Sequence, residues 1–207
     1  SSDLQVFYKT WFNEVLENSV DLSNPSASTS SIFTNGTTRN ARGLEWFYRY
    51  TGDSLFGWLS YTYSSTKESR GGGKEIPSDT DITNIVHLVA NYKITPTFQM
   101  SSRIKHQTGY VYTPVDQVWY EANTDIYQPE ENLDMVNGAR VPDTTSMTFY
   151  GQNDYQYDTW KMILRYGVDE YQLTKSSPNF NYNYDYTTKE YVTGVPFTIF
   201  TEIRAIL

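Results

Sequence analysis

The feature that most constrains this chain is an alternation of apolar and polar side chains that recurs in eight segments. The segments cover residues 4–12, 40–50, 55–64, 84–93, 97–107, 145–153, 160–169 and 198–207. A period of two residues is typical of β-strands, because successive side chains point to opposite faces of a sheet. No amphipathic helix competes with these segments, so the sequence predicts an all-β, antiparallel fold.

One face of the predicted strands carries no Asp, Glu, Lys or Arg. Its members are Leu44, Trp46, Tyr48, Tyr50, Leu55, Gly57, Leu59, Tyr61, Tyr63, Val86, Leu88, Ala90, Tyr92, Phe98, Met100, Ser102, Ile104, His106, Met147, Phe149, Gly151, Trp160, Met162, Leu164, Tyr166, Val168, Thr201, Ile203, Ala205 and Leu207. A charge on the lipid face of a membrane barrel costs about 2–4 kcal/mol at the bilayer midplane. A charge-free face therefore favours a sheet that lies against lipid.

Strand length and loop length favour the same interpretation. Strands of about ten residues can cross a bilayer when tilted, whereas soluble strands usually have five or six residues. Aromatic residues gather toward the predicted strand ends, as in the girdles of membrane barrels, and long connections alternate with short ones. The sequence thus predicts part of an antiparallel transmembrane β-barrel with about eight strands, short periplasmic turns and long extracellular loops. The alternative is a soluble antiparallel sheet whose apolar face packs on a core.

Composition narrows the function classes. The 207 residues include no Cys and two His, which excludes disulfides, Cys-ligated metals and thiol catalysis. A net charge of −8 argues against nucleic-acid binding, and no stretch approaches the roughly 20 apolar residues of a membrane helix. Without an initiator Met or a signal segment, we expect a mature piece or fragment of a longer chain.

Several stretches resemble the C-terminal barrel of TonB-dependent outer-membrane transporters. They are GLEWFYRYTGDSLFGWLSYTYSSTKES (43–69), PSDTDITNIVHLVANYKI (77–94), QTGYVYTPV (107–115), the Trp-Lys step at 160–161, NYNYDYTTKEYVTGVPF (181–197) and the closing strand around residues 203–205. The resemblance implies that residues 1–207 form the C-terminal segment of such a barrel in the bacterial outer membrane. The upstream strands and the plug domain would then lie elsewhere, in the same or a partner chain.

An open eight-stranded sheet would leave two unpaired edges in lipid, at several kcal/mol for each free backbone group. Two solutions remain open: pairing with further strands of a larger barrel, or closure of these eight strands on themselves. Members of the family have about 22 strands and a plugged lumen. The implied partners are outer-membrane lipid, the remaining strands and plug, and the TonB energy-coupling protein.

The face opposite the charge-free one is predicted to form the lumen wall. Its charged members include Glu45, Arg49, Arg103, Lys105, Lys161, Arg165 and Arg204, together with Lys93, Asp169 and Glu202. By resemblance, this wall faces the plug and the substrate path, where positive charge would hold an acidic surface or guide anions. The alternative is a set of cross-strand ion pairs that contribute little.

The candidate substrate-binding residues lie in two long loops. They are Trp119, Tyr120, Tyr127, Tyr182 and Tyr184, which stand among carboxylates and could stack on a sugar or chelate ligand. A hard cation such as Ca²⁺ or a solvated Tyr-rich rim are the alternatives. The glycine run at 71–73 lacks P-loop spacing and is interpreted as a flexible loop.

No nucleophile–base pair, HExxH or GxSxG motif occurs, so we expect neither an enzyme nor a cofactor or resident metal. The resemblance implies energised uptake of a scarce nutrient such as a metal chelate, cobalamin or an oligosaccharide. Two other functions remain open: a soluble aromatic-rich β-domain that binds carbohydrate, and a structural barrel without a plug in an envelope complex.

Overall fold

The computed structural model describes residues 1–207 except 18–32, 71, 175–179 and 192–196. Strands make up 72% of it and the described residues contain no α-helix, which confirms the predicted all-β, antiparallel fold. Part of the predicted glycine loop and part of the Tyr-rich segment 181–197 lie outside the described residues.

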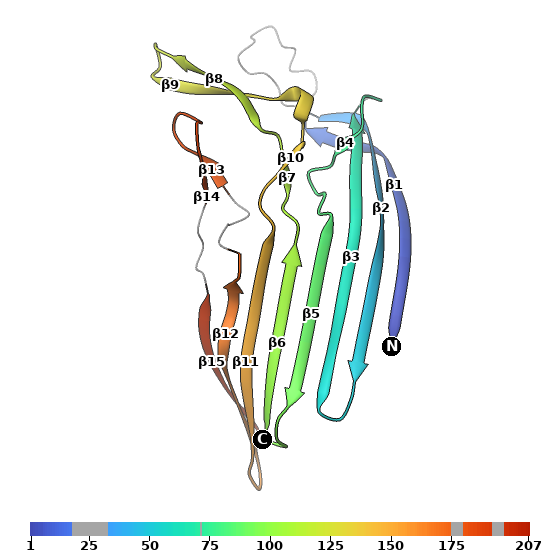
Figure 1. Ribbon diagram of the computed structural model, residues 1–207, viewed down its shortest axis with the longest axis vertical. Helices are drawn as coiled ribbons and strands as arrows, with labels where there is room; N and C mark the ends of the chain where they lie inside the picture. The colour runs from blue at the N-terminus through green and yellow to red at the C-terminus, as the bar shows by residue number, and fades with distance from the viewer. Residues whose placement is uncertain (18–32, 71, 175–179, 192–196) are drawn as a thin grey trace.

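Eight long strands form the main sheet in the order in which they occur along the chain (Figure 1). They are β1 (Ser2–Glu17), β2 (Phe33–Thr51), β3 (Leu55–Arg70), β5 (Asn84–Lys93), β6 (Phe98–Gln107), β11 (Thr144–Gln156), β12 (Lys161–Gln172) and β15 (Thr198–Ile206). Each is antiparallel to its neighbours, so the sheet is a simple up-and-down meander.

These strands coincide with the eight predicted segments, and the main differences are extensions toward the long loops. The pairing of β1 with β2 continues to Glu17↔Phe33, and that of β2 with β3 continues to Thr37↔Arg70. On β2 and β3 the apolar alternation ends before these positions, because there the two strands carry mostly polar side chains on both faces. On β1 the alternation is interrupted by shifts of register between Trp11 and Val15. The predicted lengths were therefore too short at that end.

Short turns lie at one end of the sheet and long connections at the other (Figure 1). The described long connections carry β4 (Ile76–Pro77), β7 (Val111–Tyr112), β8 (Val115–Glu121), β9 (Ile126–Glu131), a 3-10 turn (Leu133–Met135), β10 (Ala139–Arg140), β13 (Phe180–Tyr182) and β14 (Lys189–Tyr191). Period-two analysis missed these strands because they are short and mostly polar. We call this side of the sheet the loop end, and the opposite side the turn end.

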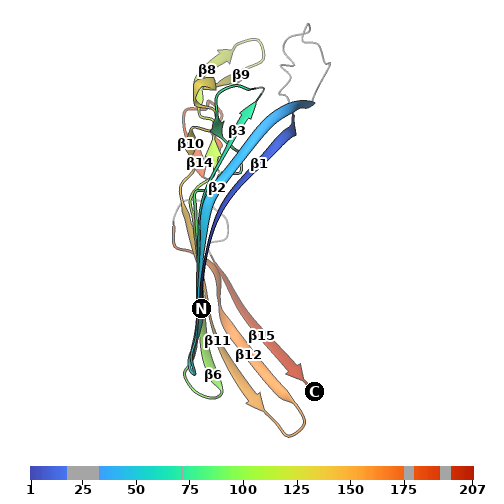
Figure 2. The same ribbon diagram turned by 90° about the vertical axis from the view of Figure 1, so that its right-hand side faces the viewer.

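The sheet is a single curved layer when seen edge-on (Figure 2). The accessible surface of the chain is 14282 Å², whereas a compact monomer of 24.0 kDa would expose about 9,900 Å². Among the described residues only Ala41, Val111, Val141 and Ile163 are buried hydrophobics. The chain therefore has almost no core of its own, and both faces of the sheet are open.

The sheet does not close on itself. In the described residues β1 pairs only with β2 and β15 pairs only with β12, and these two strands lie at opposite edges (Figure 1). No closed barrel is formed, so the self-closing eight-stranded alternative is not what this structure adopts. Each edge strand presents a row of backbone groups without a partner strand.

Candidate functional site

Strand register places the charge-free set on one face of the sheet. Leu59 lies opposite Tyr48 and Leu88, and Ile104 lies opposite Leu88 and Met147. The same holds across β11, β12 and β15, and every cross-strand partner of these residues is uncharged. The assignment of side chains to two faces, made strand by strand from sequence, is thus confirmed by independent pairings. We call this surface the apolar face.

The apolar face has the height of a hydrocarbon layer. On β3 it runs from Leu55 to Tyr63, nine residues that extend about 27 Å along the strand. At the usual barrel tilt of about 40° this gives about 21 Å, close to the apolar band of about 25 Å in membrane barrels. Large side chains on it are open to the surroundings: Val6 is 82% exposed and Ile203 is 69% exposed.

Polar groups on the apolar face bind one another. The Tyr61 hydroxyl donates to Asn84 Oδ1 at 2.9 Å, and Asn153 Nδ2 donates to the Tyr166 hydroxyl at 3.1 Å. His106 Nδ1 lies 2.8 Å from the Thr145 hydroxyl. Such mutual pairing is what a medium without water requires of polar side chains.

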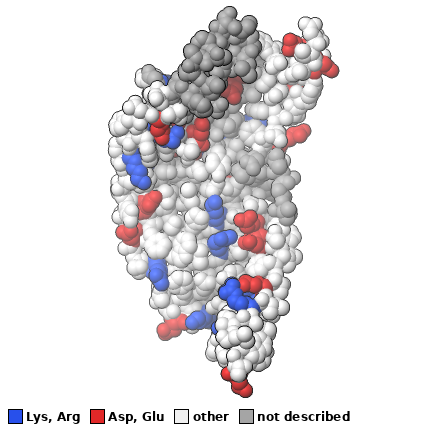
Figure 3. All heavy atoms as spheres, turned by 180° about the vertical axis from the view of Figure 1, so that it is seen from behind, with Lys and Arg blue, Asp and Glu red and all other residues white. Residues whose placement is uncertain are grey.

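The seven predicted wall residues all lie on the opposite face, which we call the polar face. Lys, Arg, Asp and Glu are dispersed over it (Figure 3). Four of the seven take part in ion pairs: Arg165 with Glu202 at 3.2 Å, Arg204 with Glu202 at 2.9 Å, Lys161 with Asp154 at 2.8 Å, and Arg103 with Asp169 at 3.6 Å. These side chains are partly exposed, so each pair contributes little to stability. For these four residues the ion-pair alternative describes the geometry.

The other wall residues differ in their contacts. The Arg49 guanidinium lies 5.2 Å from the centre of the Phe56 ring. Glu45 and Lys105 form no ion pair among the described residues.

A shallow groove of about 390 Å³ lies on the polar face between β5 and β15. Arg103, Arg165, Asp169 and Glu202 supply its charge, and the rings of Tyr150 and Phe200, 6.2 Å apart, supply an apolar wall. The sequence analysis missed these two aromatics. Both aromatics alternate in step with the charged residues of their strands, and this pattern could have placed them on the polar face.

The second aromatic group on the polar face lies on β2, β3 and β5. Phe47 and Trp58 are 6.0 Å apart, and Trp58 lies 6.4 Å from His87. Phe47 is an exposed aromatic side chain, so this group offers an apolar contact surface on the polar face.

A buried ion pair joins two long connections at the loop end. Asp81, 4% exposed, binds the guanidinium of Arg140, and its Oδ1 accepts the Thr66 N–H at 2.6 Å. Arg140 also donates to the Gly109 carbonyl oxygen at 2.9 Å. We call this arrangement the loop clasp. It unites two stretches that the resemblance singled out, 77–94 and 107–115, with β10.

Asn137 and Gly109 complete the loop clasp. Asn137 Nδ2 donates to the Pro77 carbonyl oxygen at 3.0 Å, and the Gly109 N–H donates to Asp143 Oδ1 at 3.0 Å. A Cβ on Gly109 would collide with the Val141 carbonyl oxygen, so only glycine fits there. The sequence analysis did not assign roles to Asp81, Asn137 or Arg140, because their contacts cross about 30 to 60 residues.

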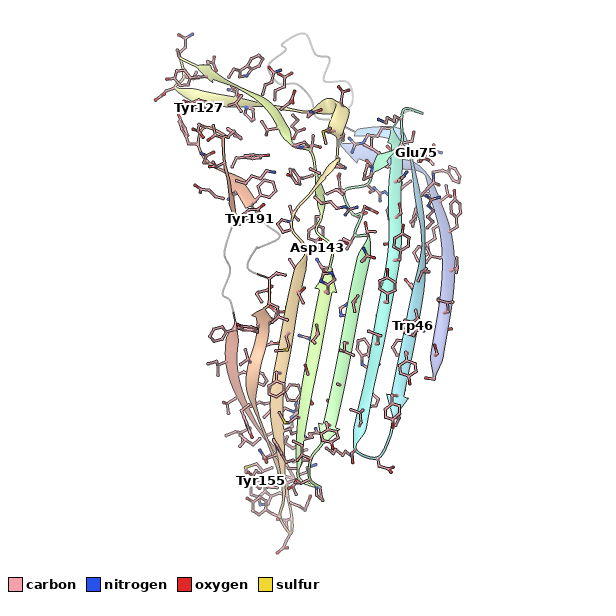
Figure 4. The ribbon with its side chains drawn as sticks, in the orientation of Figure 1. Trp46, Glu75, Tyr127, Asp143, Tyr155 and Tyr191 are labelled. Carbon is pink, nitrogen blue, oxygen red and sulfur yellow. The ribbon has the colours of Figure 1, made fainter. Side chains whose placement is uncertain are left out.

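Four of the five predicted substrate-binding residues come together above the sheet. The ring centre of Tyr127 is 5.1 Å from that of Tyr120 and 5.4 Å from that of Tyr184. Tyr182 lines a groove of about 210 Å³ together with Tyr127 and Tyr184. We call Tyr120, Tyr127, Tyr182 and Tyr184 the tyrosine cluster. Tyr127 is labelled at the top of Figure 4.

Asp125 ties the tyrosine cluster together. Its Oδ1 accepts the Tyr120 hydroxyl at 2.7 Å, and its carbonyl oxygen accepts the Tyr184 hydroxyl. The hydrogen bond to Asp125 raises the pKa of Tyr120, so this hydroxyl stays protonated and able to donate. Trp119 does not join the cluster: it points to the other side of the β8–β9 hairpin and is 63% exposed.

Lys189 holds β14 against the long loop before β11. Its Nζ lies 4.4 Å from the ring centre of Tyr112 and 5.1 Å from that of Phe180, and it donates to the Tyr112 hydroxyl. Phe180 and Tyr112 are edge-on at 5.0 Å. These contacts connect the two loops that carry the tyrosine cluster, so neither loop stands alone.

The predicted acidic loop does not form a recognisable cation site. No group of three or more His, Asp or Glu side chains placed to bind a metal occurs in the described part of the chain. Outside the gaps in the structure, no helix is long and apolar enough to span a bilayer.

Comparison with known proteins yields no match. No protein-family model, curated protein or solved structure matches this chain. The class that the fold defines is therefore a single-layered, open antiparallel β-sheet with one charge-free face.

Proposed function

We propose that this chain is a C-terminal wall segment of an outer-membrane β-barrel transporter similar to the TonB-dependent family. The observation that carries the proposal is the apolar face, charge-free across β2 to β15 over the height of a bilayer. A water-soluble sheet would bury such a face under a second layer. The described residues provide no second layer and almost no core.

In this proposal the two sheet edges receive further strands. Free backbone groups in hydrocarbon cost several kcal/mol each, so β1 and β15 require neighbours. Strands from the remainder of the barrel, in the same or a partner chain, supply them. Fewer than half of the roughly 22 strands of a plugged transporter are then contributed by this chain.

The polar face then becomes the lumen wall. Its arginines and its exposed Phe47–Trp58 group suit contact with a folded plug, which needs both charge complementarity and apolar area. The coupling to a TonB protein rests on the resemblance of the sequence stretches alone.

The tyrosine cluster is the proposed contact for the transported nutrient. Adjacent phenol rings, tilted or edge-on to one another, with a carboxylate beside them suit flat or hydroxyl-rich ligands, such as a chelate, cobalamin or an oligosaccharide. It lies on the side of the long loops, where an extracellular ligand would arrive.

Fractionation of cells that produce the complete chain tests this function, combined with uptake of cobalamin, a ferric catecholate and a maltooligosaccharide. We expect the chain in the outer-membrane fraction, and we expect its deletion to abolish proton-motive-force-dependent accumulation of one of the three. A chain that is monomeric and folded in buffer without detergent would instead support the soluble carbohydrate-binding alternative. A membrane-embedded chain without any effect on uptake would support the structural barrel without a plug.

A further inference from the structure

The apolar face ends abruptly at the loop end of β2 and β3. Leu44 and Tyr63 form its last cross-strand pair, and the next position on that face of β2 is Arg42, opposite Tyr8 and Ser65. Two positions further, Asn40 lies opposite Thr10 and Lys67. Both cations therefore project from the same side of the sheet as the apolar band, directly beyond it.

These residues line a small pocket. Tyr8, Asn40, Arg42, Ser65, Lys67 and Glu75 surround a volume of about 100 Å³. The Asn40 amide oxygen accepts the Thr10 hydroxyl at 2.9 Å, which leaves the guanidinium, the ammonium and the hydroxyl of Ser65 as donors. Figure 4 labels Glu75 beside this pocket and Trp46 in the apolar band below it.

Arg42 and Lys67 make no ion pair among the described residues, a property that they share with Arg49, Lys93 and Lys105 on the polar face. They differ from those three residues because together they line one pocket. Two neighbouring cations with hydroxyl groups beside them match the oxygens of a phosphate group.

Depth points to a lipid as the source of that phosphate. Arg42 lies two residues above Leu44, about 7 Å along the strand and about 5 Å along the bilayer normal at the usual tilt. The headgroup layer of a bilayer is about 5–7 Å thick on each side, so the pocket falls within it. Below the pocket, the exposed Val6 and the half-buried Leu44 offer a surface for acyl chains.

We propose that this pocket, on β1 to β3, binds the phosphate of an anionic glycolipid headgroup in the outer leaflet while the acyl chains lie on the apolar band. The inference rests on the proposed function, because it requires the apolar face to lie in a membrane. It assigns a lipid-binding role to Arg42 and Lys67, in addition to any role in uptake.

The test uses the membrane-extracted protein in zwitterionic detergent and measures binding of bis-phosphorylated lipid A by native mass spectrometry. Dephosphorylated lipid A and inorganic phosphate serve as comparison ligands. The variant Arg42→Gln/Lys67→Gln is matched by Arg49→Gln/Lys93→Gln, which removes the same charge from the polar face at the turn end. Glu75→Gln removes the one carboxylate that lines the pocket.

At about 1 kcal/mol for each cation near an anionic surface, we expect Arg42→Gln/Lys67→Gln to weaken lipid A binding about 30-fold. The matched control should change it less than 2-fold, and Glu75→Gln should strengthen it. Equal loss in both double variants, or equal binding of the dephosphorylated lipid, would overturn the site. Complete competition by inorganic phosphate at the lipid's own concentration would overturn the lipid assignment. A chain absent from membranes would overturn the proposed function itself. Failure of the lipid site can therefore be distinguished from failure of the proposed function.

Discussion

An arginine in the centre of the apolar face should block assembly, and Leu88 is the best position for it. Leu88 is the fifth of ten residues of β5 and lies between Leu59 and Ile104. In the proposed membrane barrel, a mid-strand position places the new charge near the bilayer midplane, where arginine costs about 2–4 kcal/mol. Leu88→Arg should therefore lower the folded-to-unfolded ratio about 30- to 900-fold.

Asn91→Arg on the same strand is the matched control. Asn91 lies on the polar face, where it accepts the Ser101 hydroxyl and borders the open groove of about 390 Å³. The groove leaves room for a longer side chain, so the expected cost is the lost hydrogen bond, about 1 kcal/mol.

Urea titration of the membrane-embedded protein, followed by tryptophan fluorescence, measures both unfolding free energies. The heat-dependent gel mobility of the membrane fraction reports assembly independently. Equal losses of stability in Leu88→Arg and Asn91→Arg would refute the assignment of the two faces.

Three further outcomes are expected. Asp81→Asn removes the charged partner of Arg140 in the loop clasp, and the loss of a charged hydrogen bond, about 1–3 kcal/mol, should speed limited proteolysis of both joined loops about 5- to 150-fold. Gly109→Ala should speed the same cleavage because the methyl group meets a carbonyl oxygen, whereas Gly73→Ala, whose nearest neighbour is the Arg70 oxygen at 3.1 Å, should not. Tyr127→Ala removes two ring contacts at about 0.5–1.5 kcal/mol each and should weaken nutrient binding, measured by calorimetry with the transported compound, at least 5-fold more than Trp119→Ala.

Local pattern was sufficient to predict the main sheet. The segments 84–93 and 97–107 match β5 and β6 to within a residue, because each strand alternates over its whole length and is bounded by turn residues. The two faces could also be separated from sequence. Side chains alternate between the faces along each strand, and paired residues on neighbouring strands point to the same face. Parity is interrupted in β1, where the register shifts around the left-handed Asn13, and in β12, where Glu170 adopts a left-handed conformation and turns Tyr171 back to the apolar face.

The loop end was predictable only in part. The sequence identified the residues of the tyrosine cluster by type, but it did not show that Trp119 lies apart from them, because the face of a hairpin to which a side chain points is not visible without its register. The loop clasp depends on contacts between Asp81 and Arg140, 59 residues apart, which no periodicity reports. The open state of the sheet could not be predicted either, since local alternation does not report whether the first and last strands pair.

The most direct test of the central claim is the environment of each face along β5. Spin labels at positions 86 to 91 of the membrane-embedded protein can be scanned with oxygen, which partitions into lipid, and with a water-soluble nickel complex. We expect oxygen accessibility to peak at Val86, Leu88 and Ala90, and nickel accessibility to be higher at the three intervening positions. High nickel accessibility at all six positions, without a period of two, would contradict the claim that the apolar face lies against lipid.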